Sequence, residues 1–237
     1  ESDLTFNATF APSTAPEGTE VDRAEVTPSV TSNGGAEAAS FAASGPSGLD
    51  EAAPYAPEDA IYQLDDGSTE NSVGLTDGGD VMWINAFQVV EGAGAISEIS
   101  SVWGSTGGAG QPPEGAPARF FVYEDPNDDG NPSDAVLLTE VETTVQDPGT
   151  DTFTTEAITP TSVEGTFFIA ALFQNQAANT FPAPLDQSSG PQGASWIVGN
   201  TVQGGFNVDD LAANDVAPAL MDDVGLPGNW ALRADGG

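Results

Sequence analysis

The chain contains no cysteine and no histidine, and its three basic residues, Arg23, Arg119 and Arg233, are arginines, so lysine is absent too. Without Cys and His there is no thiol nucleophile, no Ser–His pair, no thiolate or imidazole zinc site and no disulfide framework. Without Lys there is no Schiff base and no phosphate-loop lysine. Because these residue types carry so much of enzyme chemistry, we expect a protein that is not an enzyme.

Positive charge is also scarce, because 37 Asp and Glu stand against 3 Arg, a net charge of 3 − 37 = −34. A surface this negative repels phosphate, which argues against nucleic acid and anionic membranes as partners. No run of about eighteen apolar residues is present, so we expect no membrane insertion. The repulsion among so many acidic side chains must be screened by salt or by bound cations, as in brine or a calcium-rich matrix. With Glu1 as a processed N-terminus, these features predict an exported protein, extracellular or at the cell surface.

From residue 60 onward the chain has the pattern of one β-rich domain. Runs of strand-favouring residues alternate with Gly, Pro, Asp and Asn clusters, and helical character is confined to residues 208–213. The predicted strands are residues 81–90, 95–103, 118–123, 136–145, 152–158, 166–173, 195–198 and 230–233. Short strands separated by turns predict an all-β fold, an antiparallel β-sandwich of jelly-roll type, over residues 60–237.

Residues 1–59 are interpreted as an extended N-terminal arm and linker. Within residues 4–10 an apolar side chain occurs at every second position, which predicts a half-buried strand. The apolar positions of this strand are Leu4, Phe6, Ala8 and Phe10. The strand has two uses open to it: pairing with an edge of its own domain, or adding to the sheet of another copy, which builds a fibre if the contacts do not close. Asn7 begins an Asn-Ala-Thr sequence, which is either a glycosylation acceptor or a chance match.

The sharpest local motif is the acidic segment of residues 125–134, which resembles the opening of a calcium loop. Carboxylate or amide oxygens at the first, third and fifth positions and a glycine at the sixth suit Ca²⁺, which prefers oxygen ligands. The predicted ligands are Asp125, Asn127, Asp129, Asn131 and Asp134. Val136 stands at the twelfth position, where such loops carry a bidentate Glu. The alternative is an Asn/Asp/Gly/Pro turn that holds no ion.

Tryptophans and further acids have both a functional and a structural interpretation. Trp103 and Trp196 are candidates for stacking on a carbohydrate ligand, and Trp103, which precedes a Gly-rich segment, is expected to be the more exposed. The structural interpretation, in which these tryptophans lie in the core, is the favoured one. The acids of residues 65–80 either collect a cation or face solvent, and we expect the second; they are Asp65, Asp66, Glu70, Asp77 and Asp80. Arg119 and Arg233 lie in strand patterns, and we expect each to pair with a carboxylate.

Four motifs distinguish the part of the chain from residue 62 onward. They are LDDGSTEN at 64–71, GGDVMWINAF at 78–87, YEDPNDDGNP at 123–132 and GLPGNWALRA at 225–234. With these motifs, residues 62–234 resemble uncharacterised modules in large exported proteins of environmental bacteria. The resemblance implies a secreted β-sandwich and supplies no activity, and residues 1–59 fall outside it.

The sequence therefore predicts a non-enzymatic extracellular structural protein, a subunit of a surface filament or matrix whose partners are copies of itself. Assembly would use the strand of residues 4–10, and Ca²⁺ is the expected cofactor. The alternative function is a calcium-dependent module for polysaccharide binding or adhesion. A third interpretation is an enzyme with two facing carboxylates, one of which needs an apolar pocket that raises its pKa.

Overall fold

The computed structural model describes residues 31–32 and 60–237 of the chain. The predicted strand with Leu4, Phe6, Ala8 and Phe10, and the acceptor asparagine Asn7 within it, lie outside the described residues and stay predictions. The division into residues 1–59 and 60–237 likewise stays a prediction.

The described part is built of strands and two short 3-10 helices. The strands are β1 (Thr31–Ser32), β2 (Ala60–Tyr62), β3 (Asn71–Val73), β4 (Gly79–Gln88), β5 (Ala95–Ser101), β6 (Pro117–Glu124), β7 (Val136–Thr144), β8 (Thr154–Ser162), β9 (Thr166–Gln176), β10 (Ala183–Asp186), β11 (Ser195–Asn200), β12 (Val216–Leu220), β13 (Asn229–Trp230) and β14 (Leu232–Gly236). The 3-10 helices are η1 (Pro132–Asp134) and η2 (Leu211–Ala213). No helix among these elements has the length and apolar character needed to cross a bilayer.

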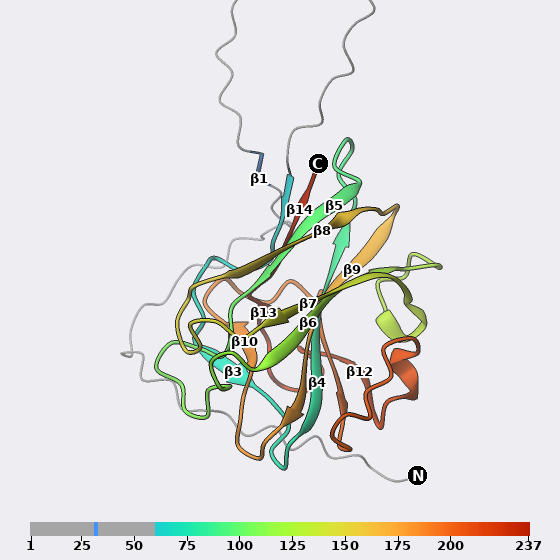
Figure 1. Cartoon of the computed structure of the whole chain (residues 1–237). Coiled ribbons are helices and arrows are strands. Elements are labelled where there is room, and N and C mark those ends of the chain that lie inside the picture. The colour runs from blue at the N-terminus through green and yellow to red at the C-terminus, as the bar shows by residue number, and fades with distance from the viewer. Residues whose placement is uncertain (1–30, 33–59) are drawn as a thin grey trace, which may run out of the picture.

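The strands form three sheets, shown in Figure 1. The five-stranded sheet has the order β1-β2-β14-β5-β8, the six-stranded sheet the order β12-β11-β4-β9-β6-β7, and the three-stranded sheet the order β13-β10-β3. All neighbouring strands pair antiparallel. The predicted all-β, antiparallel class is therefore confirmed.

The central strands of the six-stranded sheet are buried on both faces, which explains their long apolar runs. In β4, Val81, Trp83 and Phe87 belong to one core cluster, while Met82 and Ile84 belong to the other. The neighbouring β9 alternates between the same two clusters along its length. The six-stranded sheet is thus the middle layer of the described part.

The first core cluster joins the three sheets. It contains Ile99 and Leu232 from the five-stranded sheet, Phe120 and Phe167 from the six-stranded sheet, and Leu185 from the three-stranded sheet. All five side chains are fully buried. Since burial of a large apolar side chain is worth about 1.5–3 kcal/mol, this shared cluster is the main force that holds the sheets together.

The second cluster lies on the opposite face of the six-stranded sheet and fixes the loop that follows β6. Ala135 and Phe206, which lie in connecting segments, and Leu211 of η2 pack into this cluster. The Tyr123 hydroxyl donates to the Val208 carbonyl oxygen (3.1 Å), and burial raises the pKa of Tyr123 above its ordinary value. The 125–135 loop is therefore anchored to a packed surface at both of its ends.

The long predicted strands are present, with ends shifted by a few residues, and one prediction is wrong. Residues 230–233, predicted as one strand, belong to β13 and β14, which lie in different sheets. The break is at Ala231, whose N–H donates to the Pro184 carbonyl (3.2 Å) and whose carbonyl accepts from the Val102 N–H (3.2 Å). The chain therefore changes sheet at Ala231. The helical character predicted for 208–213 corresponds to η2.

Candidate functional site

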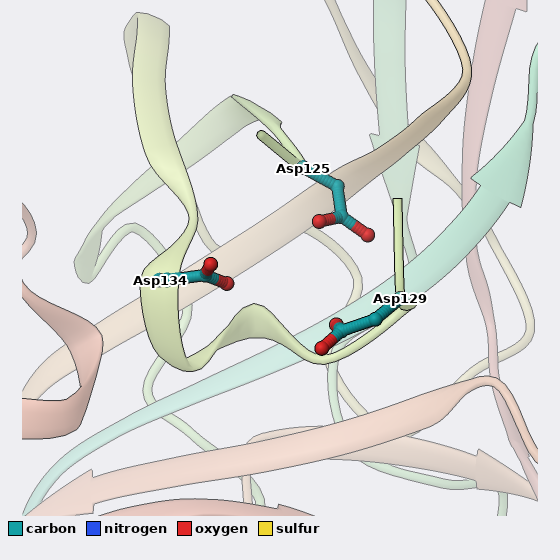
Figure 2. A group of neighbouring side chains, drawn as sticks. All are labelled: Asp125, Asp129 and Asp134. Carbon is teal, nitrogen blue, oxygen red and sulfur yellow. The ribbon is translucent and has the colours of Figure 1, made fainter. Parts of the chain in front are cut away.

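Three aspartates of the loop between β6 and β7 converge on one small volume, as Figure 2 shows. Asp125, Asp129 and Asp134 each place a carboxylate oxygen within 4.8 Å of the others. Asp125 is buried, whereas Asp129 and Asp134 are exposed. The structure thus brings together three of the five predicted ligands, with one carboxylate at the base and two at the rim.

Asp125 organises the loop from inside. Its Oδ2 accepts from the Gly130 N–H (2.7 Å), and its Oδ1 accepts from the Asp128 N–H (3.0 Å) and the Asn127 N–H (3.3 Å). Gly130 has φ 76° and Asp128 has φ 60°, a left-handed conformation that glycine adopts freely and aspartate tolerates. The glycine at the sixth position is therefore needed for its backbone conformation.

The two predicted amide ligands have different positions. The Asn127 side-chain amide donates to Asp134 Oδ2 (2.8 Å) and Asp129 Oδ2 (3.2 Å), so it bridges the two exposed carboxylates. The Asn131 side-chain oxygen instead accepts from the Ser133 N–H (3.0 Å) and hydroxyl (2.7 Å) and caps η1. Asn127 therefore belongs to the cluster, whereas the oxygen of Asn131 is engaged in the cap.

The chemistry of this cluster suits a hard cation. Ca²⁺ takes six to eight oxygen ligands, of which the three aspartates supply part and water and other loop oxygens would supply the rest. Asp125, Asp129 and Asp134 are the residues that would hold a cation here. Calcium binding itself stays a prediction, because acidic loops of this kind are also common without an ion.

A hollow of about 580 Å³, here called the Trp196 hollow, lies directly beside this loop. Its lining includes Asp128, Asp129, Thr166, Gln192 and Trp196. The sequence positions are far apart, so only the tertiary structure brings one member of the aspartate cluster and a predicted stacking tryptophan to one cavity.

A hydrogen-bond network lines one wall of the Trp196 hollow. Asp128 Oδ1 accepts from the Thr166 N–H (2.7 Å), from the Thr166 hydroxyl, and from the Gln88 amide (3.4 Å). The hydrogen bonds from Thr166, followed by the one from Gln88, lower the pKa of the Asp128 carboxyl below its ordinary value. Asp128 is therefore held as a carboxylate at the rim.

Trp196 is half-buried on β11, opposite Ile84 of β4, and its indole Nε1 has no hydrogen-bond partner among the described residues. Gln192 Oε1 has none either, although the Gln192 amide nitrogen donates to the Leu64 carbonyl (2.8 Å). Both atoms are buried. Buried polar groups without partners are uncommon in folded proteins, and here two of them belong to residues that line the same hollow.

Trp103 lies in the core, as the structural interpretation predicts, and the expectation that it is more exposed than Trp196 is wrong. Its ring is fully buried, stacks on Phe120 (5.8 Å between centroids) and meets Trp83 edge-on (5.6 Å). Its indole N–H donates to the Thr154 hydroxyl (2.9 Å). Because the chain turns inward after β5 ends at Ser101, the tryptophan fills the space between the sheets and takes no part in a surface platform.

The prediction that the acids of residues 65–80 face solvent is only partly right. Asp66 and Asp77 are exposed, but Asp65 and Asp80 are buried. Asp65 is paired with Arg233. Sequence reasoning missed the burial of these two residues because a buried and a solvated aspartate look alike in a run of acids.

A larger hollow, of about 980 Å³, lies at the ends of β6, β7 and β9 and includes Glu142 and Glu156 in its lining. Glu142 is exposed, and Glu156 Oε1 accepts from the Thr143 hydroxyl (2.8 Å). Neither acid therefore stands alone in the apolar surroundings that a two-carboxylate hydrolase needs for its general acid.

Comparison of the chain with protein-family models, with curated proteins and with solved structures gave no match. The resemblance to modules of exported proteins therefore stays a prediction.

Proposed function

We propose that the protein is a non-enzymatic, extracellular structural subunit of a surface filament or matrix. In this proposal residues 4–10 add as a strand to the sheet of a neighbouring copy, and the five-stranded and six-stranded sheets form a sandwich of jelly-roll type. The cluster that these sheets share supports the sandwich arrangement. The observation that carries the assembly proposal is the outer edge of β7, with which no second strand of the described part pairs.

Among the edge strands of the described part, β7 alone is both long and free of proline. It has nine residues, contains no proline, and pairs only with β6 within the described part. The edge strands β8 and β12 contain Pro160 and Pro218, while β1, β3 and β13 are two or three residues long. Proline and shortness both protect an edge against pairing with another chain. β7 has neither protection.

Apolar exposure is concentrated at the same edge. Val136 and Leu138, at the start of β7, are two of the three exposed large hydrophobic residues in the described part, the third being Val202. An unpaired edge that also exposes apolar side chains is the template that β-strand addition uses.

Charge favours residues 4–10 as the strand that pairs there. β7 carries Glu140 and Glu142, and the protein is negative overall, so an acidic segment would be repelled. Residues 4–10 contain no charged side chain, and as a strand they would place four apolar residues on one face. The same electrostatics argue against nucleic acid and anionic membrane as partners.

The absence of cysteine permits a clean crosslinking test. Single-cysteine chains Phe6→Cys and Leu138→Cys are mixed and oxidised, and we expect disulfide-linked heterodimers. An Ala217→Cys chain, altered at an exposed position on β12, serves as the matched control and should not link to Phe6→Cys. Heterodimers absent from the first mixture, or equally abundant in the control, would show that β7 is not the acceptor.

Truncation tests the assembly itself. Deletion of residues 1–12 should abolish filaments seen by negative-stain microscopy and leave the folded body unchanged by circular dichroism. Filaments that persist in the truncated protein, or an intact chain that stays strictly monomeric at high concentration, would overturn the structural proposal.

The second candidate function is a calcium-dependent carbohydrate-binding or adhesion module. The observation that favours it is the shared position of Asp129, which belongs to the aspartate cluster and also lines the Trp196 hollow. A cation held by the cluster would lie at the edge of this hollow. There it would bind hydroxyl oxygens of a sugar that lies next to Trp196.

Thermal unfolding tests the calcium part of this candidate. After stripping with EDTA, added calcium should raise the Tm of the protein, and the rise should be lost in the double variant Asp129→Asn/Asp134→Asn. Asp209→Asn/Asp210→Asn removes the same charge from exposed positions elsewhere and should retain the rise. An equal rise with magnesium, or in the double variant, would indicate general screening and contradict a calcium site.

A further inference from the structure

Trp196 differs from the other tryptophans because its ring is partly exposed and lines the Trp196 hollow, where a ligand can contact it. The chain has four tryptophans, and the other three, Trp83, Trp103 and Trp230, have no exposed surface. Trp196 is half-buried and lines the hollow. An indole with an apolar ring and a polar N–H suits a ligand that is apolar on one side and polar on the other.

The polar groups of the lining form a complementary set. Gln88, Thr166 and Asp128 make one hydrogen-bonded wall, and Asp129 adds an exposed carboxylate. Trp196 and Gln192 also belong to the lining, and each carries a polar atom without a partner, the indole Nε1 and the amide Oε1, although both atoms are covered by neighbouring atoms. A hydroxyl group is both a donor and an acceptor, so a ligand rich in hydroxyls can satisfy such a mixed lining.

Charge and size restrict the ligand further. The lining contains no arginine, and Asp128 and Asp129 repel anions. The volume of about 580 Å³ lies within the range of ligand sites, about 300–1,000 Å³, and suits a ligand of one or two sugar rings. The site is thus unsuited to phosphorylated or acidic sugars.

We propose that the Trp196 hollow binds a neutral oligosaccharide, with one sugar ring stacked on Trp196 and its hydroxyls bonded to Asp129 and Gln192. This inference deepens the carbohydrate-binding candidate and rests on it, but it does not depend on assembly through residues 4–10. Because Trp196 Nε1 and Gln192 Oε1 are covered by neighbouring atoms, binding through them requires one of these side chains to turn.

Fluorescence quenching isolates Trp196 from the other tryptophans. Acrylamide is neutral, so the negative surface does not exclude it, and it should quench Trp196 and leave the three buried rings largely unaffected. A panel of neutral oligosaccharides, including cellobiose, maltose and lactose at about 10 mM, is then added, a concentration that detects a Kd of about 1 mM. We expect at least one member of the panel to lower the quenching constant about twofold or more.

Variants separate the site from the fold. Calorimetric titration with the protecting sugar should show binding weakened about tenfold by Gln192→Ala and abolished by Trp196→Ala. Gln146→Ala, altered at an exposed glutamine outside the hollow, should bind normally. Trp196→Phe, which keeps a ring, should retain part of the affinity, and circular dichroism verifies that each variant is folded.

Three results would overturn the inference. The first is a Trp196 that acrylamide fails to reach in the intact chain. The second is a panel in which no sugar lowers the quenching constant. The third is a sugar that lowers the quenching constant equally in the Trp196→Phe and Gln192→Ala variants and shows no binding by calorimetry. Repeating the titration in EDTA separates the two proposals. Sugar binding that persists without calcium supports the site and refutes calcium dependence. Loss of sugar binding when residues 1–12 are deleted would show that the site depends on assembly through residues 4–10.

Discussion

Arg119 and Arg233 confirm the prediction that each pairs with a carboxylate, but their surroundings differ. Arg233 Nε donates to Asp65 Oδ2 (3.1 Å), Arg233 Nη2 also donates to Asp65, and the Asp65 side chain has no exposed surface. Arg119 pairs with Glu140 (2.9 Å), with 24% and 47% of the two side chains exposed. Removal of one partner should therefore have very different consequences at the two sites.

At Arg233 we expect substitution by methionine to lower the free energy of unfolding by about 3–5 kcal/mol, because Asp65 is left as a buried charge without a partner. Arg119→Met, the matched control, should cost about 1 kcal/mol or less, because solvent screens that pair. Urea unfolding followed by circular dichroism measures both. Equal losses in the two variants would contradict this account of Asp65.

Asp128 gives a prediction about pH. Its pKa is lowered, chiefly by the Thr166 hydroxyl and N–H, so its stabilising contribution is full above the pKa of the unfolded chain and is lost as the pH falls through the lower folded pKa. Thr166→Val removes the hydroxyl and should raise the pKa of Asp128 toward 3.8. Carboxyl-carbon NMR titration measures this shift. Thr155→Val, at an exposed position on β8, should leave it unchanged.

Among the elements, Asp80 at the start of β4 joins three segments of the chain. It is fully buried and accepts from the N–H groups of Asn175 (2.7 Å), Gly204 (3.0 Å) and Phe206 (3.1 Å). One carboxylate therefore fastens the end of β9 and the segment that precedes η2 to β4.

Asp80→Ala should lower the free energy of unfolding by about 3 kcal/mol or more, because three amides lose their acceptor and each unpaired buried group costs about 1–3 kcal/mol. Asp80→Asn keeps one acceptor oxygen and should cost less. Hydrogen exchange at Asn175, Gly204 and Phe206 should accelerate in the alanine variant. Asp77→Ala, an exposed neighbour, controls for charge; if it were equally destabilised, the loss would not come from these hydrogen bonds.

The elements also show where sequence patterns stop being informative. Long strands such as β6 and β9 are evident from their apolar and aromatic content, because both contribute to buried cores. The prediction lacks β2, β3, β10 and β12, which are three to five residues long. Two of them contain proline, and all are too short to show a period of two. Their pairing depends on the neighbouring strand.

For the whole molecule, the net charge of −34 opposes both folding and association. Raising NaCl from about 0.01 M to about 1 M shortens the Debye length from about 30 Å to about 3 Å, so self-repulsion should weaken and the Tm should rise. Differential scanning calorimetry measures the rise, and tetramethylammonium chloride separates screening from sodium binding. A Tm that stays constant or falls would show that charge repulsion does not limit stability.

The sequence by itself determined the all-β class, the long strands, the pairing of both described arginines and the acidic loop with Asp125, Asp129 and Asp134. These follow from residue type and local spacing, which act over a few neighbours. Only the tertiary structure decided that Asp65 and Trp103 are buried and that Asp129 and Trp196 line one hollow. Burial depends on what distant strands place against a side chain, and the local sequence does not carry that information.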